Sequence, residues 1–146
     1  MGFEERWESA CNRQYHRGPD SQGEWRSSFE GGEIWMGHQR LAILDLSEAG
    51  HQPMTSDRGT LVYNGEVYNY IELRAEMERA GEIFRTGTDT EVVLRGILHW
   101  GMAEACRRFN GMWAIAWWDV REKRLWLSRD RFGEKPLYWE QHENGI

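Results

Sequence analysis

Polar residues that interrupt or end apolar runs are the first candidates for chemistry in this chain. Arg40 lies in GHQRLAILD, Asn64 and Glu66 lie in LVYNGEVYNY, and Asp89 lies in TGTDTEVVL. A polar group within an apolar run needs a partner or a ligand, because burying it unpaired costs free energy. Asn64-Gly65 also places a side-chain amide beside an unhindered backbone N–H, and such a pair can hold an oxyanion.

Each of these residues also has a purely structural interpretation. Arg40 can be a surface cation at a strand end, Asn64-Gly65 a hairpin turn, and Asp89 the N-cap of a helix. A simple hairpin loop fits residues 61–67 poorly, because the next segment has the pattern of a helix. The residue types alone therefore leave both interpretations open.

Several other kinds of site lack their residue patterns. The histidines His16, His38, His51 and His99 show no HxH or HxxxH spacing, so we expect no metal site. No GxGxxG or GxxxxGK[ST] loop is present to cradle phosphates. Two cysteines, Cys11 and Cys106, are too few for a disulfide scaffold or a four-cysteine zinc site, which favours a cytoplasmic protein.

The composition predicts one globular domain. The chain has 146 residues, of which 40% are hydrophobic, and a formal net charge of −6. This acidic balance argues against a nucleic-acid partner. No window of 18 apolar residues predicts a membrane span, and the first residues lack the apolar core of a secretory signal. The nine tryptophans could form a stacking platform, but their apolar neighbours favour a role in the core.

The elements that position the candidate residues follow from hydrophobic periodicity. Residues 3–15 carry a helical stripe that includes Cys11, and further helices are expected at 70–80, 90–100 and 102–108. Asn69 and Glu72 have the spacing of a capping box, and Thr88 or Asp89 can cap the second of these helices. Strands are expected at 33–46, 60–68, 112–118, 124–128 and 136–140. The fold class is therefore α+β, with helices packed on layers of antiparallel sheet.

Six segments, in this order, resemble the glutaminase domain of glutamine-hydrolysing asparagine synthetases, a class II glutamine amidotransferase. They are HRGPDSQG, GHQRLAILDLSEAGHQPM, LVYNGEVYNYIELR, TGTDTEVVL, FNGMWAIAWWD and RDRFGEKPLYW. The resemblance implies an N-terminal-nucleophile hydrolase, a four-layer α/β/β/α sandwich that hydrolyses glutamine to glutamate and ammonia. It also suggests that HRGPD and RDRFGEKP shape turns beside the pocket and the domain junction.

The resemblance assigns a role to each candidate residue. Arg40 would pair with the α-carboxylate of glutamine, which suits a guanidinium. Asn64 and Gly65 would form the oxyanion hole, and Glu66 and Asp89 would bind the α-ammonium group. Leu41 and Ile43 would line the same pocket.

The nucleophile of the family is a cysteine at the mature N-terminus, whose own amine serves as the base. The present sequence begins Met1-Gly2-Phe3, and Cys11 falls within the predicted first helix. We therefore expect residues 1–146 to be a glutaminase domain that lacks the family's first strand, is shortened at both ends and is inactive alone. The synthetase domain, where ATP and magnesium would act, would be absent, and no cofactor is expected here.

Three interpretations remain from the sequence. The chain is a piece of a glutamine-dependent asparagine synthetase, or a non-catalytic descendant that binds glutamine or a partner protein, or an unrelated tryptophan-rich module. The expected partners are glutamine and a synthetase domain or subunit, with no nucleic acid or membrane. Self-association into a homodimer is left open.

Overall fold

A computed structural model describes residues 2–41, 50–142 and 145 of the chain. Its elements, in order, are α1 (Phe3–Arg13), the 3-10 helix η1 (Tyr15–Arg17), β1 (Ser21–Phe29), β2 (Gly32–Arg40), β3 (Met54–Thr55), β4 (Gly59–Val67), α2 (Tyr70–Arg79), α3 (Asp89–Trp100), α4 (Met102–Arg108), β5 (Gly111–Asp119) and β6 (Arg124–Arg129). Within the described residues, no helix is long and apolar enough to cross a membrane.

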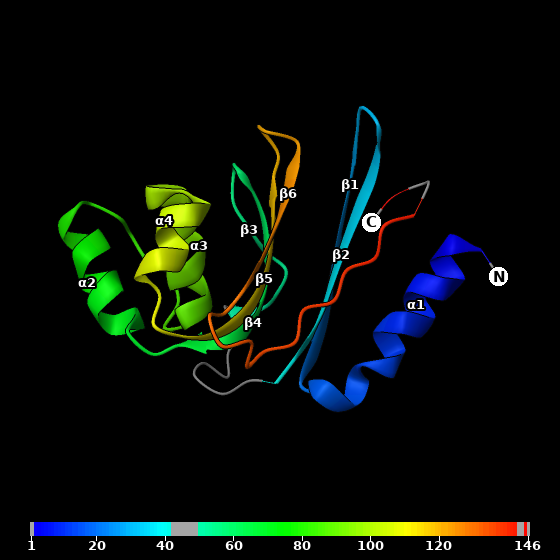
Figure 1. Cartoon of the computed structure of the whole chain (residues 1–146), viewed down its shortest axis with the longest axis horizontal. Coiled ribbons are helices and arrows are strands. Elements are labelled where there is room, and N and C mark those ends of the chain that lie inside the picture. Colours follow the sequence, from blue (N-terminus) through cyan, green and yellow to red (C-terminus); the bar gives the residue numbers. More distant parts are fainter. Residues whose placement is uncertain (1, 42–49, 143–144, 146) are drawn as a thin grey trace.

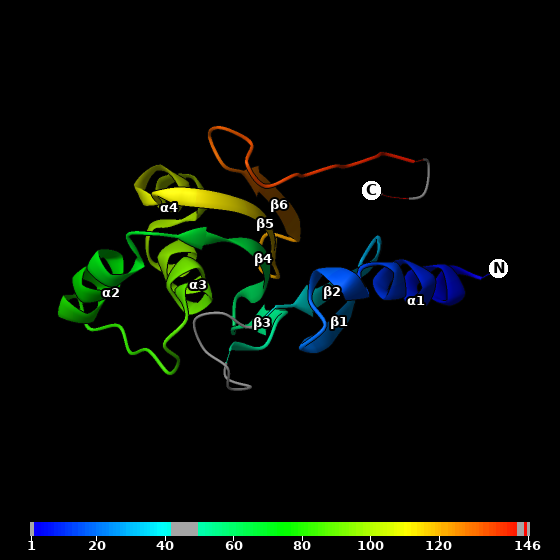
Figure 2. The same ribbon diagram turned by 90° about the horizontal axis from the view of Figure 1, so that it is seen from below.

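The elements form four layers, as the resemblance predicted. Helix α1 covers the two-stranded sheet β1-β2, which faces the sheet β3-β4-β5-β6, and helices α2 to α4 cover the far side of that second sheet (Figure 1). All strand pairs are antiparallel. Figure 2 shows the same succession of layers from below. The α+β class and the sandwich architecture are thus confirmed.

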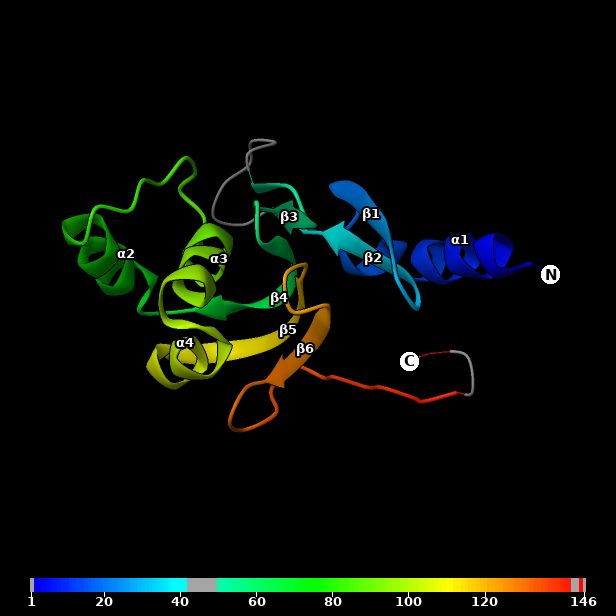
Figure 3. The same cartoon turned by 90° about the horizontal axis from the view of Figure 1, so that it is seen from above.

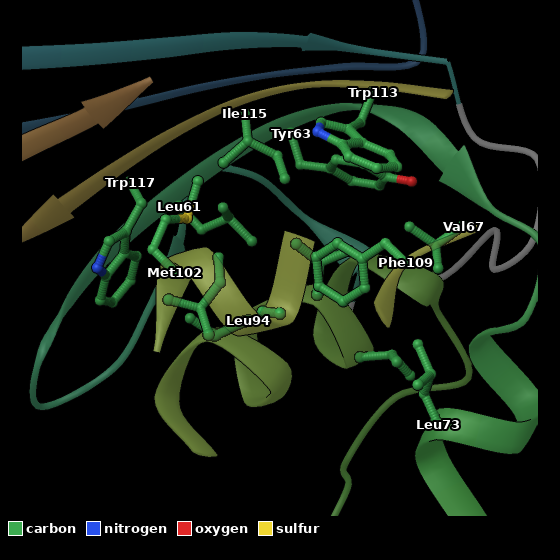
Figure 4. Packing of buried hydrophobic residues seen from close by; sticks show 14 of the residues in the cluster. Leu61, Tyr63, Val67, Leu73, Leu94, Met102, Phe109, Trp113, Ile115 and Trp117 are labelled. Carbon is green, nitrogen blue, oxygen red and sulfur yellow. The ribbon is translucent and has the colours of Figure 1, made fainter. Parts of the chain in front are cut away.

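The main core lies between β4-β5 and the helices. Odd-numbered residues of both strands point to this side because strand side chains alternate between faces, so Leu61, Trp113 and Ile115 are almost fully buried. They belong, together with Val92 and Val93 of α3, to a single buried cluster, and Figure 4 shows how Leu61, Trp113 and Ile115 face Leu94 of that helix. The apolar residues that alternate along β4 and β5 and those that recur with helical spacing along α3 therefore form one core.

The two sheets contact each other through their inner faces. The rings of Phe29 and Trp118 lie 4.9 Å apart between centroids, and Met36 of β2 is 5% exposed. Trp113, Trp117 and Trp118 are buried, so the core-filling interpretation holds for these tryptophans. Trp139, in contrast, is 67% exposed.

All four predicted helices are present within a few residues of their expected bounds. The sequence did not predict β1 or the short β3. The prediction of a strand at 136–140 is wrong, because this segment pairs with no described strand. It runs away from β6 as an extended segment without a neighbour in the sheet (Figure 3). A strand is defined by its ladder, and a favourable residue pattern does not create one without a partner.

The predicted capping box at α2 is also wrong. The side chain of Asn69 makes no cap hydrogen bond. Instead, its Nδ2 donates to the carbonyl of Arg108 at 3.0 Å, and its Oδ1 accepts from the backbone N–H of Asn110 at 2.9 Å. Asn69 therefore joins the start of α2 to the end of α4, a contact that its local sequence spacing does not reveal.

The RDRFGEKP segment is a turn organised by Asp130. The buried Asp130 carboxylate accepts hydrogen bonds from the backbone N–H groups of Trp113, Phe132, Glu134 and Lys135. Burial acts to raise the pKa of Asp130, but these donors outweigh it and hold the pKa at about 2. These hydrogen bonds agree with the prediction that RDRFGEKP shapes a turn.

Candidate functional site

Asp89 lies at the first turn of α3 without capping it. The cap is Thr88, whose hydroxyl accepts from the backbone N–H of Glu91 at 3.2 Å. Asp89 Oδ2 instead accepts from the hydroxyl of Tyr63 at 2.7 Å and from the backbone N–H of Val67 at 3.0 Å. Since no described residue bonds Oδ1, this 6% exposed carboxylate keeps one oxygen for another partner.

Arg40 is at the end of β2, on the other sheet, yet it reaches the same turn of α3. A methyl group at Gly50 would collide with Nη2 of Arg40 and lie 2.9 Å from Cγ2 of Thr88. The guanidinium therefore rests against the backbone of Gly50, next to the residue that precedes Asp89. The backbone of Arg40 is held by the last residue of HRGPD, since its carbonyl accepts from the N–H of Asp20 at 3.1 Å.

Gly65 is inside β4 and not in a hairpin turn, so the turn interpretation of Asn64-Gly65 is wrong. Residues opposite each other alternate between hydrogen-bonded and non-bonded pairs in an antiparallel ladder. Just beyond β4, the N–H of Tyr68 donates to the carbonyl of Asn110 at 2.7 Å, just before β5. In this register the even-numbered residues of β4 therefore direct their backbone N–H and C=O groups toward β5. The N–H of Gly65 consequently points to the opposite edge of β4.

Asn64 and Glu66 have their side chains on the face of β4 that looks toward the β1-β2 sheet. Asn64 is exposed and Glu66 is half-buried, while their odd-numbered neighbours Tyr63 and Val67 point into the core. The Glu66 charge is close enough to contribute to the raised pKa of Tyr63. The arrangement thus puts an amide and a carboxylate beside the backbone edge that carries the Gly65 N–H.

The structure does not bring every predicted residue into the site equally. Leu41 follows β2 directly and its side chain is 55% exposed. Ile43 lies outside the described residues, so its role remains a prediction. Among the residues that are described, no group of three or more His, Cys, Asp or Glu side chains could hold a metal ion.

Sequence reasoning missed four residues that surround the site. These are His38, Gly50, Gln52 and Tyr63. Burial lowers the pKa of His38 to about 4, with the nearby charges of Arg40 and His51 adding to the effect, so the imidazole is neutral at pH 7. Gly50 and Gln52 lie in the AGHQPM string, which could have drawn attention to them.

Neither cysteine has the surroundings of a reactive nucleophile. Cys11 lies on α1, where its Sγ would be 3.3 Å from a methyl group at Gly37 of β2. Cys106 lies on α4, with its Sγ 3.4 Å from the hydroxyl of Ser128. Burial raises the pKa of both thiols, and a thiol that stays protonated is a poor nucleophile.

The structure is thus a two-sheet sandwich between helical layers, with Arg40, Glu66, Asp89 and the outward N–H of Gly65 as its candidate polar groups. The sequence of residues 3–146 matches the protein family described as "Glutamine amidotransferase domain". The chain belongs to this family.

Known proteins agree with this assignment. The chain is 43% identical over 126 residues to "Asparagine synthetase [glutamine-hydrolyzing] 1" of Bacillus subtilis, covering 85% of this chain and 19% of the relative. It is 37% identical to "Amidase chry2" of Gibberella zeae, over 90% of this chain and 19% of that protein. The chain thus spans about a fifth of these relatives.

Among solved structures, the glutamine phosphoribosylpyrophosphate amidotransferase of Bacillus subtilis superimposes with a TM-score of 0.60. The sequences are 20% identical, and the overlap covers 74% of this chain and 31% of the other. At this identity the likeness concerns the fold, and it supports the four-layer arrangement described above.

Proposed function

We propose that this domain binds glutamine and, within its complete enzyme, hydrolyses the side-chain amide to glutamate and ammonia. Arg40 pairs with the α-carboxylate, while Asp89 and Glu66 hold the α-ammonium group. The side chain of Asn64 and the N–H of Gly65 stabilise the oxyanion that forms at the amide carbon. Leu41 and Ile43 line the pocket.

One observation carries this proposal: the Arg40 guanidinium lies near the start of α3, where Asp89 is also located. Arg40 reaches Thr88 across Gly50, and Asp89 is the next residue. A free amino acid presents a carboxylate and an ammonium group on one carbon, which matches such a pair. Asp89 is bonded to Val67, two residues beyond Gly65, so the side-chain amide of glutamine would extend toward that donor.

The nucleophile of the proposed reaction is not a cysteine of this chain. Loss of a covalent nucleophile lowers turnover by about 10⁶ in a hydrolase, whereas one oxyanion donor contributes about 10²–10³. A polypeptide of these 146 residues should therefore bind glutamine without releasing ammonia. The raised pKa of both half-buried thiols, those of Cys11 and Cys106, favours a second candidate function, a glutamine-binding domain without catalysis.

The proposed partner is a synthetase domain or subunit that uses the ammonia. We propose aspartate, activated as an aspartyl-adenylate, as the acceptor, because the Bacillus subtilis relative is named an asparagine synthetase. ATP and magnesium would belong to that partner and not to the domain described here. The Gibberella zeae relative is named an amidase instead, so the acceptor is part of this proposal.

Calorimetric titration with glutamine tests the binding proposal. We expect heat at millimolar glutamine with the unaltered chain, and loss of that heat in Arg40→Ala and in Asp89→Ala. Ala10→Ser, on the outer helix α1, is the control that should bind normally. Absence of heat from the unaltered chain would refute the proposal.

A coupled assay for ammonia tests whether the 146-residue polypeptide hydrolyses glutamine. We expect no release from the 146-residue polypeptide. Ammonia release that disappears in Cys11→Ser would show that this thiol is the nucleophile and that our interpretation of its surroundings is wrong.

A further inference from the structure

The edge of β4 that carries Gly65 is covered by side chains in place of a strand. Strand β3 pairs with β4 only at Thr60 and Leu61. Beyond that point the odd-numbered backbone groups of β4 would be left open, and buried backbone groups need partners. Two side chains, Gln52 and Asp89, supply them.

Gln52 replaces the neighbouring strand at Tyr63. Its Nε2 donates to the Tyr63 carbonyl at 2.9 Å, and its Oε1 accepts from the Tyr63 N–H at 2.7 Å. An amide that bonds both groups of one residue reproduces the pairing of a strand. Gln52 is 5% exposed, so this pair of bonds is protected from water.

Asp89 closes the same edge on the other side of Gly65, at the Val67 N–H. The N–H of Gly65, between these two contacts, meets no acceptor among residues 2–41, 50–142 and 145. Between Tyr63 and Val67, the Gly65 N–H is therefore the backbone donor on this edge that can bind a ligand.

Tyr63 connects the two contacts. Gln52 holds its backbone, while its hydroxyl donates to Asp89 Oδ2 at 2.7 Å. Burial, assisted by the charge of Asp89, raises the pKa of Tyr63 above its ordinary value, which keeps the hydroxyl protonated as the donor of this bond at neutral pH. The side chain is 2% exposed and packs in the core, which restricts its rotation (Figure 4).

We propose that Gln52 and Tyr63 are positioning residues of the glutamine site. Gln52 fixes the edge of β4 so that the Gly65 N–H faces the ligand, and Tyr63 fixes the Asp89 carboxylate so that Oδ1 faces the same ligand. Neither residue touches the substrate. This inference rests on the proposed function, because it assigns the two groups to the recognition of glutamine.

A role in stability alone makes a different prediction from a positioning role. Removing the Tyr63 hydroxyl lowers stability in either case, since Asp89 loses a buried donor. Only a positioning role also changes the affinity of the folded protein for glutamine. Residues that orient ligands of metal sites change affinity by about 10–100-fold, and we expect about tenfold here.

The experiment compares Tyr63→Phe, Gln52→Ala and the control Tyr70→Phe in the 146-residue chain. Tyr70 is also partly buried against the core, but its hydroxyl makes no hydrogen bond to a described residue. Glutamine affinity is measured by calorimetry at a temperature where all variants are folded. The backbone N–H resonance of Gly65 is followed by NMR with and without glutamine.

We expect about tenfold weaker glutamine binding in Tyr63→Phe and Gln52→Ala, as for residues that orient metal ligands. Binding should be unchanged in Tyr70→Phe. In Gln52→Ala the Gly65 resonance should shift before glutamine is added and respond less to it. Unchanged affinity and an unchanged Gly65 resonance in both variants would overturn the inference while leaving the proposed function intact. Failure of the unaltered chain to bind would instead overturn the proposed function, and this inference with it.

Discussion

One added methyl group should lower stability at Gly65 but mainly glutamine affinity at Gly50. At Gly65 it would collide with the carbonyl oxygen of Met112 and lie 2.8 Å from Cα of Trp113, both backbone atoms of β5. At Gly50 the added methyl group meets only side-chain atoms, the end of the flexible Arg40 side chain and, at 2.9 Å, Cγ2 of Thr88. Backbone in a central strand pair cannot yield without separating the strands, whereas a guanidinium can move away.

The magnitudes follow from what has to move. Overpacking costs about 1–3 kcal/mol, so we expect Gly65→Ala to lower Tm by roughly 3–10 °C. Gly50→Ala should cost about 1 kcal/mol or less, because Arg40 is displaced into solvent. Loss of its charged hydrogen bonds, about 1.5–3 kcal/mol, should however weaken glutamine binding by about 10–100-fold.

Thermal unfolding and glutamine calorimetry on the same samples separate the two effects. Gly87→Ala is the matched control, because no atom lies within 4 Å of the added methyl group. It should leave both Tm and affinity nearly unchanged. The reasoning is refuted if Gly50→Ala destabilises the domain as much as Gly65→Ala, or if it binds glutamine normally.

Three further predictions concern single ionisable groups. Because the pKa of His38 is lowered from 6.5 to about 4, the unfolded chain binds more protons in that window, and stability should fall as pH falls through it. His38→Gln should flatten this part of the pH–stability curve by up to about 3 kcal/mol in urea titrations. The contribution of Asp130, whose pKa is lowered from 3.8 to about 2, is present above pH 3.8 and lost toward pH 2. Asp130→Asn should lower Tm at neutral pH and reduce the acid dependence in that range. Cys106→Ser should leave glutamine affinity unchanged in calorimetry, since Cys106 lies on α4 and contacts Ser128 rather than the site; a loss of binding would contradict the site assignment.

The helices and the central strands could be predicted because each carries its own periodic pattern. The stripe of α3 and the apolar run of β5 are local properties, and the structure places both in the core. The errors occur where a partner decides the outcome. Residues 136–140 have a strand pattern without a described partner, and Asn69 bonds Arg108 and Asn110 in place of its own helix.

The sequence by itself determined the types of the functional groups. Arg40, Asn64, Gly65, Glu66 and Asp89 stood out as polar or permissive residues in apolar surroundings, and their motifs led to the glutamine amidotransferase family. Their local interpretations as a surface cation, a turn and a cap were equally consistent with that pattern.

Only the tertiary structure decided between these interpretations. Arg40 comes from another layer than Asp89, and its guanidinium lies against Gly50, next to Thr88 at the start of α3, because Gly50 lacks a side chain. The direction of the Gly65 N–H depends on the register of β4 against β5, where a shift of one residue would turn it toward β5. The roles of Gln52 and Tyr63 likewise depend on which backbone groups of β4 are left without a strand, because hydrogen bonding along a sheet edge is set by the neighbours in space.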